Sequence, residues 1–231
     1  MPEIIDDKSQ HCVPFILERL RLYREQYESR HQTPPPFFLG LNGVQGAGKT
    51  TLVQTLSQTL SSPPHNLPVV VLSIDDLYLP HDQQTALATS HPDNPLVQHR
   101  GVPSTHDVET GIQLFDALQN RKTDIRIPSY DKSQFNGAGD RKPEGEWETV
   151  NKAGEKPVEV IIFEGWCVGF RALSEADVEK KWKEAREQAE KNDGSYMGRL
   201  GKLKLQDVLF INERLREYDA LTDRFGAFMH M

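Results

Sequence analysis

The residues best suited to chemistry lie between positions 43 and 51, where the sequence reads GVQGAGKTT. Gly43, Gly48, Lys49 and Thr50 match the spacing G-x-x-x-x-G-K-[ST]. In this motif the glycines allow backbone N–H groups to close around phosphate oxygens, and the positive end of the following helix faces the same anion. The spacing therefore predicts a P-loop that binds a nucleoside triphosphate. The alternative is a glycine-rich turn that binds nothing.

Each part of this turn has an expected role toward the nucleotide. Lys49 is expected to reach the outer phosphates and to stabilise charge on the γ-phosphate as it moves, and Thr50 is expected to bind Mg²⁺. The residues expected to bind the nucleotide are Gly43, Val44, Gln45, Gly46, Ala47, Gly48, Lys49, Thr50 and Thr51.

Carboxylates follow two apolar runs that are typical of buried strands. The run at 69–74 ends in Asp75 and Asp76, and the run at 158–163 ends in Glu164. Because ligands of open parallel sheets bind beyond the carboxyl ends of the strands, these acids are expected to face the P-loop. Asp75 is the candidate base for an attacking hydroxyl, and Asp76 is expected to support Mg²⁺ or to cap the next turn. The alternative for this pair is a solvated helix cap.

Glu164 is the counterpart of the Walker B acid. It is expected to hold Mg²⁺ through water or to order the attacking hydroxyl, and Gly165 behind it allows a close turn. The alternative is a strand-end glutamate without a role. The predicted catalytic residues are thus Asp75, Lys49 and Glu164, and the predicted metal ligands are Thr50, Asp75 and Glu164.

The elements that must position these groups are readable from the spacing of apolar residues. A continuous apolar run at 37–41 predicts a buried strand before the turn, and Leu52, Val53, Leu56 and Leu60 repeat at helical spacing after it. The pattern predicts an α/β P-loop NTPase fold, a doubly wound and mainly parallel sheet with helices on both faces. We expect an N-terminal helix and proline-rich lead-in at 1–36 and one kinase domain at 37–231.

Helix signals and further apolar runs predict the remaining elements. Pro14 is expected to open a helix over 13–27, and a capping box of Ser104 with Asp107 is expected to start a helix over 104–120. A second capping box, Ser174 with Asp177, predicts a helix that ends near 193–194. The other expected elements are strands at 69–74, 125–127, 158–163 and 227–231 and helices at 82–89 and 205–218.

Composition excludes several classes of function. The chain has 231 residues and a formal net charge of −7, which argues against broad affinity for nucleic acids or membrane surfaces. It shows neither a signal peptide nor a run long enough to span a membrane. Cys12 and Cys167 lie far apart, so we expect no disulfide, a reducing compartment, and a location in the cytoplasm or the nucleus.

The polar region at 80–141 is expected to form the acceptor side of the site. Its histidines at 81, 91 and 99 show no recurring ligand spacing and are expected to be surface residues. Arg100 and His106 flank the start of a predicted helix and are candidates to line an acceptor site. The segment at 128–141 carries both charge signs, an aromatic residue and glycines, as loops that hold substrates often do. The alternative is a flexible surface hairpin.

Five segments together resemble one family of kinases. They read GVQGAGKTTLV, SIDDLYLP, HRGVPSTHD, IPSYDKSQFNGAGDR and IIFEGWCVGF, and the resemblance that they carry extends over roughly 37–231. The chain resembles the eukaryotic D-glycerate 3-kinases and their fungal relatives, a branch near the phosphoribulokinase, uridine kinase and pantothenate kinase group. The resemblance implies transfer of the γ-phosphate of ATP, with Mg²⁺, to the 3-hydroxyl of D-glycerate.

The resemblance also implies roles for individual residues. Asp75 is similar in position to the general base of the uridine kinase relatives, and Tyr130 and Arg141 are similar to acceptor-binding residues. The carboxylate of glycerate suits a cation, so Arg100, Lys132 or Arg141 is expected to clamp it. The residues expected to bind the acceptor are Asp76, Tyr78, Arg100, His106, Tyr130, Lys132 and Arg141.

Relatives continue beyond a strand like 227–231 into an arginine-bearing lid, a helix and a last strand. We therefore expect this chain to be a fragment or an abbreviated form. The expected substrate is a small hydroxy acid. The sequence does not predict an oligomeric state. The alternatives are a nucleotide-binding module with little or no catalysis, a kinase for a nucleoside or pantothenate-like acceptor, and a hydrolase that drives a partner.

Overall fold

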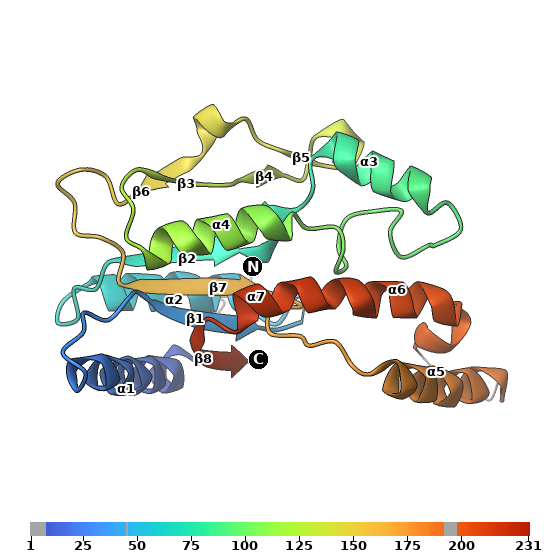
Figure 1. Cartoon of the computed structure of the whole chain (residues 1–231), viewed down its shortest axis with the longest axis horizontal. Helices are drawn as coiled ribbons and strands as arrows, with labels where there is room; N and C mark the ends of the chain where they lie inside the picture. The colour runs from blue at the N-terminus through green and yellow to red at the C-terminus, as the bar shows by residue number, and fades with distance from the viewer. Residues whose placement is uncertain (1–7, 45, 192–197) are drawn as a thin grey trace, which may run out of the picture.

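A four-stranded parallel sheet runs through the centre of the molecule (Figure 1). The computed structural model describes residues 8–44, 46–191 and 198–231. The strand order is β2-β7-β1-β8, and all three pairings are parallel, so the carboxyl ends of the strands lie along one edge. The strands are β1 (Phe37–Asn42), β2 (Val69–Ser73), β7 (Val160–Gly165) and β8 (Phe225–His230).

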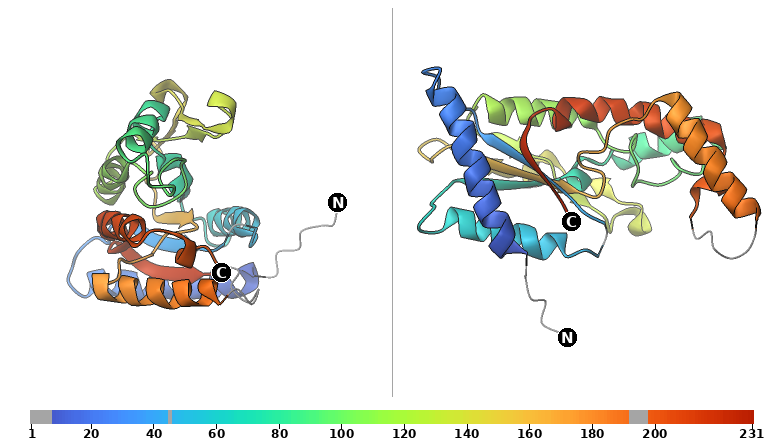
Figure 2. Two further views of the ribbon diagram at one scale, coloured as in Figure 1. Left: turned by 90° about the vertical axis from the view of Figure 1, so that its right-hand side faces the viewer. Right: turned by 90° about the horizontal axis from the view of Figure 1, so that it is seen from below.

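Helices cover both faces of this sheet, as the sequence predicts for a doubly wound fold. Helices α1 (Ser9–Glu28) and α2 (Lys49–Ser61) pack on one face, and α4 (Val108–Gln119) and α7 (Asp219–Thr222) pack on the other. The right-hand view of Figure 2 shows the sheet between α2 and α4. Because side chains alternate along a strand, Phe37, Leu39 and Leu41 of β1 join the core on the α2 side, while Phe38 joins the other core.

A smaller layer stands over the carboxyl edge and α4, at the top of Figure 1. It contains the antiparallel pair β3 (Ile125–Ile127) with β6 (Glu148–Val150) and the hairpin β4 (Tyr130–Asp131) with β5 (Asp140–Arg141). Helix α3 (His81–Ser90) lies beside this hairpin. The segment after residue 128 is therefore a hairpin. It contacts the 3-10 helix η1 (Ile74–Leu77), which follows β2 of the sheet.

An arm of two helices, α5 (Glu175–Glu190) and α6 (Leu205–Leu215), extends beyond the sheet on the right of Figure 1. The Ser174 side chain caps α5 by accepting the N–H of Asp177, as predicted. The predicted end of this helix at 193–194 lies outside the described residues. Short 3-10 helices complete the described chain: η2 (Phe135–Gly137), η3 (Glu144–Glu146), η4 (Leu200–Lys202) and η5 (Arg216–Tyr218).

Two predicted helix starts are wrong. Helix α1 begins at Ser9 and contains Pro14, because burial of Ile16 and Leu20, worth about 1.5–3 kcal/mol each, offsets the roughly 3 kcal/mol cost of an internal proline. Helix α4 is capped by Asp107, which accepts the N–H of Thr110, and not by Ser104. The carboxylate is favoured there because it also interacts with the helix dipole.

The boundaries of several predicted strands also shift. Strand β7 spans Val160–Gly165 and not 158–163, so Glu164 lies within the strand. Ile74 belongs to η1 and not to the strand before it, since the Ser73 hydroxyl accepts the N–H of Asp75 and starts a 3-10 turn. Strand β8 begins two residues earlier than predicted, at Phe225. Within the described chain, none of the helices is both long and apolar enough to span a bilayer.

Candidate active site

The predicted P-loop connects β1 to α2 through an open turn, in which the N–H of Ala47 donates to the carbonyl of Val44 at 3.2 Å. Gly46 and Gly48 have φ values of +83° and +86°, which side-chain-bearing residues rarely adopt, and the space beside both is open for at least 4 Å. Helix α2 starts at Lys49, and the first N–H groups of a helix have no partner within it. An open cradle with unpaired N–H groups fits the phosphates of a nucleotide. Gln45, also expected to contact the nucleotide, lies outside the described residues.

The Lys49 ammonium lies over this turn. Its Nζ donates to the carbonyl oxygens of Gly43, at 2.7 Å, and Val44, at 3.2 Å. A bound phosphate oxygen would compete for the same ammonium, because its negative charge attracts the ammonium more strongly than the dipole of a neutral carbonyl does. The Lys49 side chain therefore already lies next to the expected position of the phosphates.

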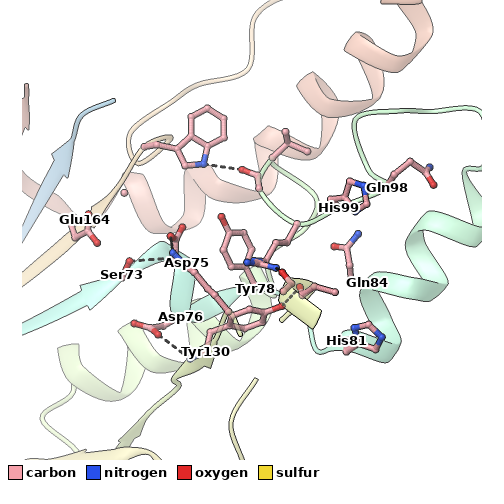
Figure 3. A pocket seen from close by; sticks show the side chains of 18 of the residues that line it. Ser73, Asp75, Asp76, Tyr78, His81, Gln84, Gln98, His99, Tyr130 and Glu164 are labelled. Atoms are coloured by element: carbon pink, nitrogen blue, oxygen red, sulfur yellow. Dashed lines mark hydrogen bonds and ion pairs between the residues drawn. The ribbon is translucent and has the colours of Figure 1, made fainter. Parts of the chain in front are cut away.

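Strand register brings the predicted acids to the same place. Glu164 on β7 is aligned with Leu41 on β1 and with Ser73 on β2, directly before η1. Figure 3 shows Glu164, Ser73, Asp75 and Asp76 along one side of a cavity. This open cavity has a volume of about 1930 Å³, and Lys49, Thr50, Asp75 and Glu164 all line it. The structure thus brings together the residues predicted for nucleotide, metal and base.

Gly165 allows this convergence. A Cβ at Gly165 would lie 2.3 Å from Cγ2 of Ile74, far inside van der Waals contact. The end of β7 and the start of η1 can therefore approach only because residue 165 has no side chain. The glycine predicted to allow a close turn instead allows close packing of two strand ends, which carry Glu164 and Asp75.

The donor set around the P-loop fits Mg²⁺. The Thr50 hydroxyl and the carboxylates of Asp75 and Glu164 are hard oxygen donors, which Mg²⁺ prefers, and all three line the cavity. In the described part of the chain no group of three or more His, Cys, Asp or Glu side chains is arranged to hold a metal. Magnesium commonly binds with few protein carboxylates, its other ligands being phosphates and water. These residues would therefore hold Mg²⁺ together with a nucleotide.

The β4–β5 hairpin is tied directly to η1. Asp76 accepts the backbone N–H of Tyr130 at 3.0 Å, and Lys132 Nζ lies 2.6 Å from Oδ2 of Asp75. Burial raises the pKa of Asp76, and the nearby charge of Asp75 adds to the shift. Asp76 therefore anchors the hairpin, a contact that none of its three predicted roles includes. Tyr78, Tyr130 and Lys132 all line the cavity, as predicted for acceptor residues.

The two candidate arginines are both engaged by the protein. Arg100 lines the cavity, but its Nη1 donates to the carbonyls of Gly137 and Ala138, and its guanidinium lies 5.6 Å from the centre of the Tyr130 ring. Arg141 is only 13% exposed and does not line the cavity. It pairs with Asp107 at 2.9 Å and donates to the Tyr78 carbonyl at 3.1 Å. Arg141 thus supports the helix cap, because its guanidinium faces Asp107 and not the cavity.

His106, also expected at the acceptor site, lies behind Tyr78. It is 5% exposed, stacks on the Tyr78 ring with centroids 4.5 Å apart, and its Nδ1 lies 2.6 Å from the Tyr218 hydroxyl. It lies between Tyr78 and Tyr218 of η5, and Tyr78 lines the cavity while His106 does not. Burial lowers the pKa of His106 to about 4, although the charge of Asp75 opposes the shift.

This burial predicts acid sensitivity of the fold. His106 in the unfolded chain binds a proton below its ordinary pKa of about 6.5, but in the folded chain only below about 4. Its contribution to stability is therefore complete above pH 6.5 and is lost as the pH falls toward 4. Between pH 7.5 and 5 we expect His106 to account for about 2 kcal/mol of lost unfolding free energy.

Urea unfolding at both pH values measures this effect. In His106→Gln the loss between pH 7.5 and 5 should shrink by about 2 kcal/mol, whatever the absolute stability of the variant. His11→Gln, at an exposed position of α1, should show the same pH dependence as the unmodified chain. An unchanged pH dependence in His106→Gln contradicts the expectation.

Several residues of the cavity wall were not predicted from the sequence. Asn42, 2% exposed at the end of β1, donates to the carbonyls of Trp166 and Val168 and contacts Nδ1 of His230 through its Oδ1. It thereby ties β1, the turn after β7 and the end of β8 together. A polar residue ending an apolar strand was the available hint. Other cavity residues missed by sequence reasoning are His81, Gln84, Gln98, Trp166 and Phe170.

In the parallel sheet the P-loop strand lies beside an acid-bearing strand, and the nucleotide-binding turn lies at the carboxyl edge. These features define the class of P-loop phosphotransferases. The comparisons agree with this class. The solved structure of D-glycerate 3-kinase from Cryptococcus neoformans var. grubii superimposes with a TM-score of 0.84 at 32% identity, over 98% of this chain and 73% of that one. No protein-family model matches the chain.

Curated relatives give the same result. The uncharacterized kinase mug58 of Schizosaccharomyces pombe is 36% identical over 85% of this chain. The chloroplastic D-glycerate 3-kinase of Arabidopsis thaliana is 30% identical over 84% of it. The chain belongs to the D-glycerate 3-kinase family of P-loop kinases, which confirms the predicted resemblance and fold class. It spans 64% and 43% of the lengths of these two relatives.

Proposed function

We propose that the chain transfers the γ-phosphate of ATP to the 3-hydroxyl of D-glycerate. The observation that carries the proposal is the shared cavity: the P-loop, the strand-end acids and the β4–β5 hairpin all line it, in a chain of the D-glycerate 3-kinase family. A kinase needs these three parts together, because phosphoryl transfer is catalysed mainly by positioning and by electrostatic stabilisation.

Each residue has a defined task in this reaction. The backbone amides of 46–50 bind the phosphates, and Thr50 with Glu164 holds Mg²⁺, which when bound neutralises charge on the phosphates. Asp75 accepts the proton of the acceptor hydroxyl as its oxygen bonds to the γ-phosphorus and the bond to ADP breaks. Lys49 leaves the carbonyls of Gly43 and Val44 for the γ-phosphate and stabilises its charge.

The division of the chain at residue 36 remains a prediction. Helix α1 of the lead-in buries Ile16 and Leu20 against the same sheet that carries the P-loop, which supports its role as a structural cover of the kinase domain. A location in the cytoplasm or nucleus is likewise a prediction, which rests on the wide separation of the two cysteines, Cys12 and Cys167, in the sequence. We expect no nucleic-acid or membrane partner, in keeping with the net charge of −7.

A coupled assay of ADP release tests the proposal. The purified chain is supplied with ATP and Mg²⁺ and separately with D-glycerate, other short hydroxy acids, uridine or pantothenate. We expect ADP release to depend on D-glycerate, and phosphorus NMR to identify the 3-phosphate. Release with only uridine or pantothenate contradicts glycerate as acceptor. ATP binding by calorimetry without release for any acceptor would instead identify a nucleotide-binding module.

A further inference from the structure

Among the described residues of the acceptor half of the cavity, Lys132 is the cation that the protein engages least. The guanidinium of Arg100 is bound to backbone carbonyls and stacked over Tyr130, and Arg141 is turned away toward Asp107. Lys132 lines the cavity with a side chain that is 55% exposed. The partner that the structure gives its ammonium is Asp75, at 2.6 Å.

This ion pair conflicts with the role of Asp75 as base. The acceptor hydroxyl must donate its proton to a carboxylate oxygen, and Lys132 occupies Oδ2 of that carboxylate. Both side chains are partly exposed, 55% for Lys132 and 30% for Asp75, so their pairing is worth only about 0–1 kcal/mol. A competing carboxylate can therefore remove the ammonium at little cost.

The backbone at Lys132 is held while its side chain is not. Asp131 accepts the N–H and the hydroxyl of Ser133, at 2.9 Å and 2.6 Å, which shapes the turn around Lys132. On its other side, the N–H of Tyr130 is bound to Asp76. The flexible four-carbon stem of a lysine can swing its ammonium by several ångströms from such a fixed point. The ammonium is thus free to move between two neighbouring carboxylates.

From these contacts we infer that Lys132 determines the specificity for the acceptor: it leaves Asp75, binds the acceptor carboxylate, and thereby frees Asp75 to act as base. The inference rests on the proposed function and names the class of acceptor. Because Lys132 and Asp75 touch, the acceptor must carry its carboxylate close to the reacting hydroxyl. In glycerate, two bonds of about 1.5 Å each separate C3 from the carboxylate carbon.

This role predicts that Lys132→Gln loses affinity for D-glycerate but not for ATP. Loss of a charge-assisted hydrogen bond should raise KM for D-glycerate about 10- to 100-fold, while KM for ATP stays the same. Glyceramide, which has the same hydroxyls but no carboxylate, should lose nothing, since Lys132 no longer blocks Asp75. The ratio of kcat/KM for glycerate over glyceramide should therefore fall at least 10-fold. Lys132→Arg should recover part of the ratio.

A matched control lies on the same hairpin. Lys142 does not line the cavity, and its backbone N–H bonds to the carbonyl of Ser129, so Lys142→Gln should keep the ratio of the unmodified chain. An unchanged ratio in Lys132→Gln overturns the inference. An equal loss of kcat for both acceptors with unchanged KM also overturns it, because Lys132 would then act on the phosphoryl group.

Failure of the proposed function gives a different result. It appears in the unmodified chain as absence of glycerate-dependent ADP release, before any variant is made. Calorimetric titration of glycerate and glyceramide in the presence of a non-hydrolysable ATP analogue then tests Lys132 without turnover. Weaker binding of glycerate, but not of glyceramide, to Lys132→Gln supports the inference, and equal binding by both proteins overturns it.

Discussion

Asp75→Asn is expected to reduce kcat for glycerate-dependent ADP release by about 10²- to 10⁴-fold. The amide keeps the size and shape of the side chain but cannot accept the proton of the acceptor hydroxyl. Asp75 stands at the start of η1, held by the Ser73 hydroxyl, which accepts its backbone N–H at 3.3 Å. That bond does not involve the carboxylate, so the substitution should leave the local backbone intact.

ATP affinity separates this effect from general damage. The phosphates are bound by the backbone amides of the P-loop and not by Asp75, so the Kd for ATP, measured by calorimetry, should stay within a few-fold of the original. Asp82→Asn is a suitable control, because Asp82 lies in the first turn of α3 and its carboxylate accepts the N–H of Gln83 outside the cavity. Full turnover in Asp75→Asn would remove Asp75 from the mechanism.

Lys49→Met is expected to reduce kcat by about 10²- to 10³-fold, comparable to the loss of one preorganised donor to a transition-state charge. Lys49 Nζ lies within 3.2 Å of two P-loop carbonyls, next to the open cradle of Gly46 and Gly48. Methionine replaces the stem without the charge. Weaker ATP binding should accompany the loss but should be smaller, because the backbone amides of the turn remain.

Single-turnover kinetics at saturating ATP isolate the chemical step for this variant. Lys122→Met, at an exposed lysine that does not line the cavity, should behave like the unmodified chain. A Lys49→Met protein with normal kcat and only raised KM for ATP would show that Lys49 binds the ground state and transition state equally.

The fold was largely predictable because its signals are local. The apolar runs of β1, β2 and β7 and the repeats of Leu52, Val53, Leu56 and Leu60 depend on the period of each element alone. The errors lie where a distant contact decides. Asp107 replaces Ser104 as cap while pairing with Arg141 of β5, and Pro14 is tolerated because α1 packs on the sheet.

The candidate site was predictable in part for the same reason. Asp75 and Glu164 follow buried strands, and strand ends of a parallel sheet share one edge. The acceptor side depends on how the β4–β5 hairpin folds over η1. The sequence offered three cations for the acceptor carboxylate and favoured the two arginines. In the structure Arg100 is bound to the hairpin backbone, Arg141 supports a helix cap, and Lys132 contacts Asp75.

The amino-acid sequence by itself determined the nucleotide turn, the fold class and the acids at the strand ends, since each follows from the spacing of neighbouring residues. Only the tertiary structure decided that His106 is buried behind Tyr78 and that Lys132 contacts the candidate base. The reason is physical: the orientation of a charged side chain depends on which oppositely charged or aromatic groups the folded chain brings beside it, and those groups come from residues far away in the sequence.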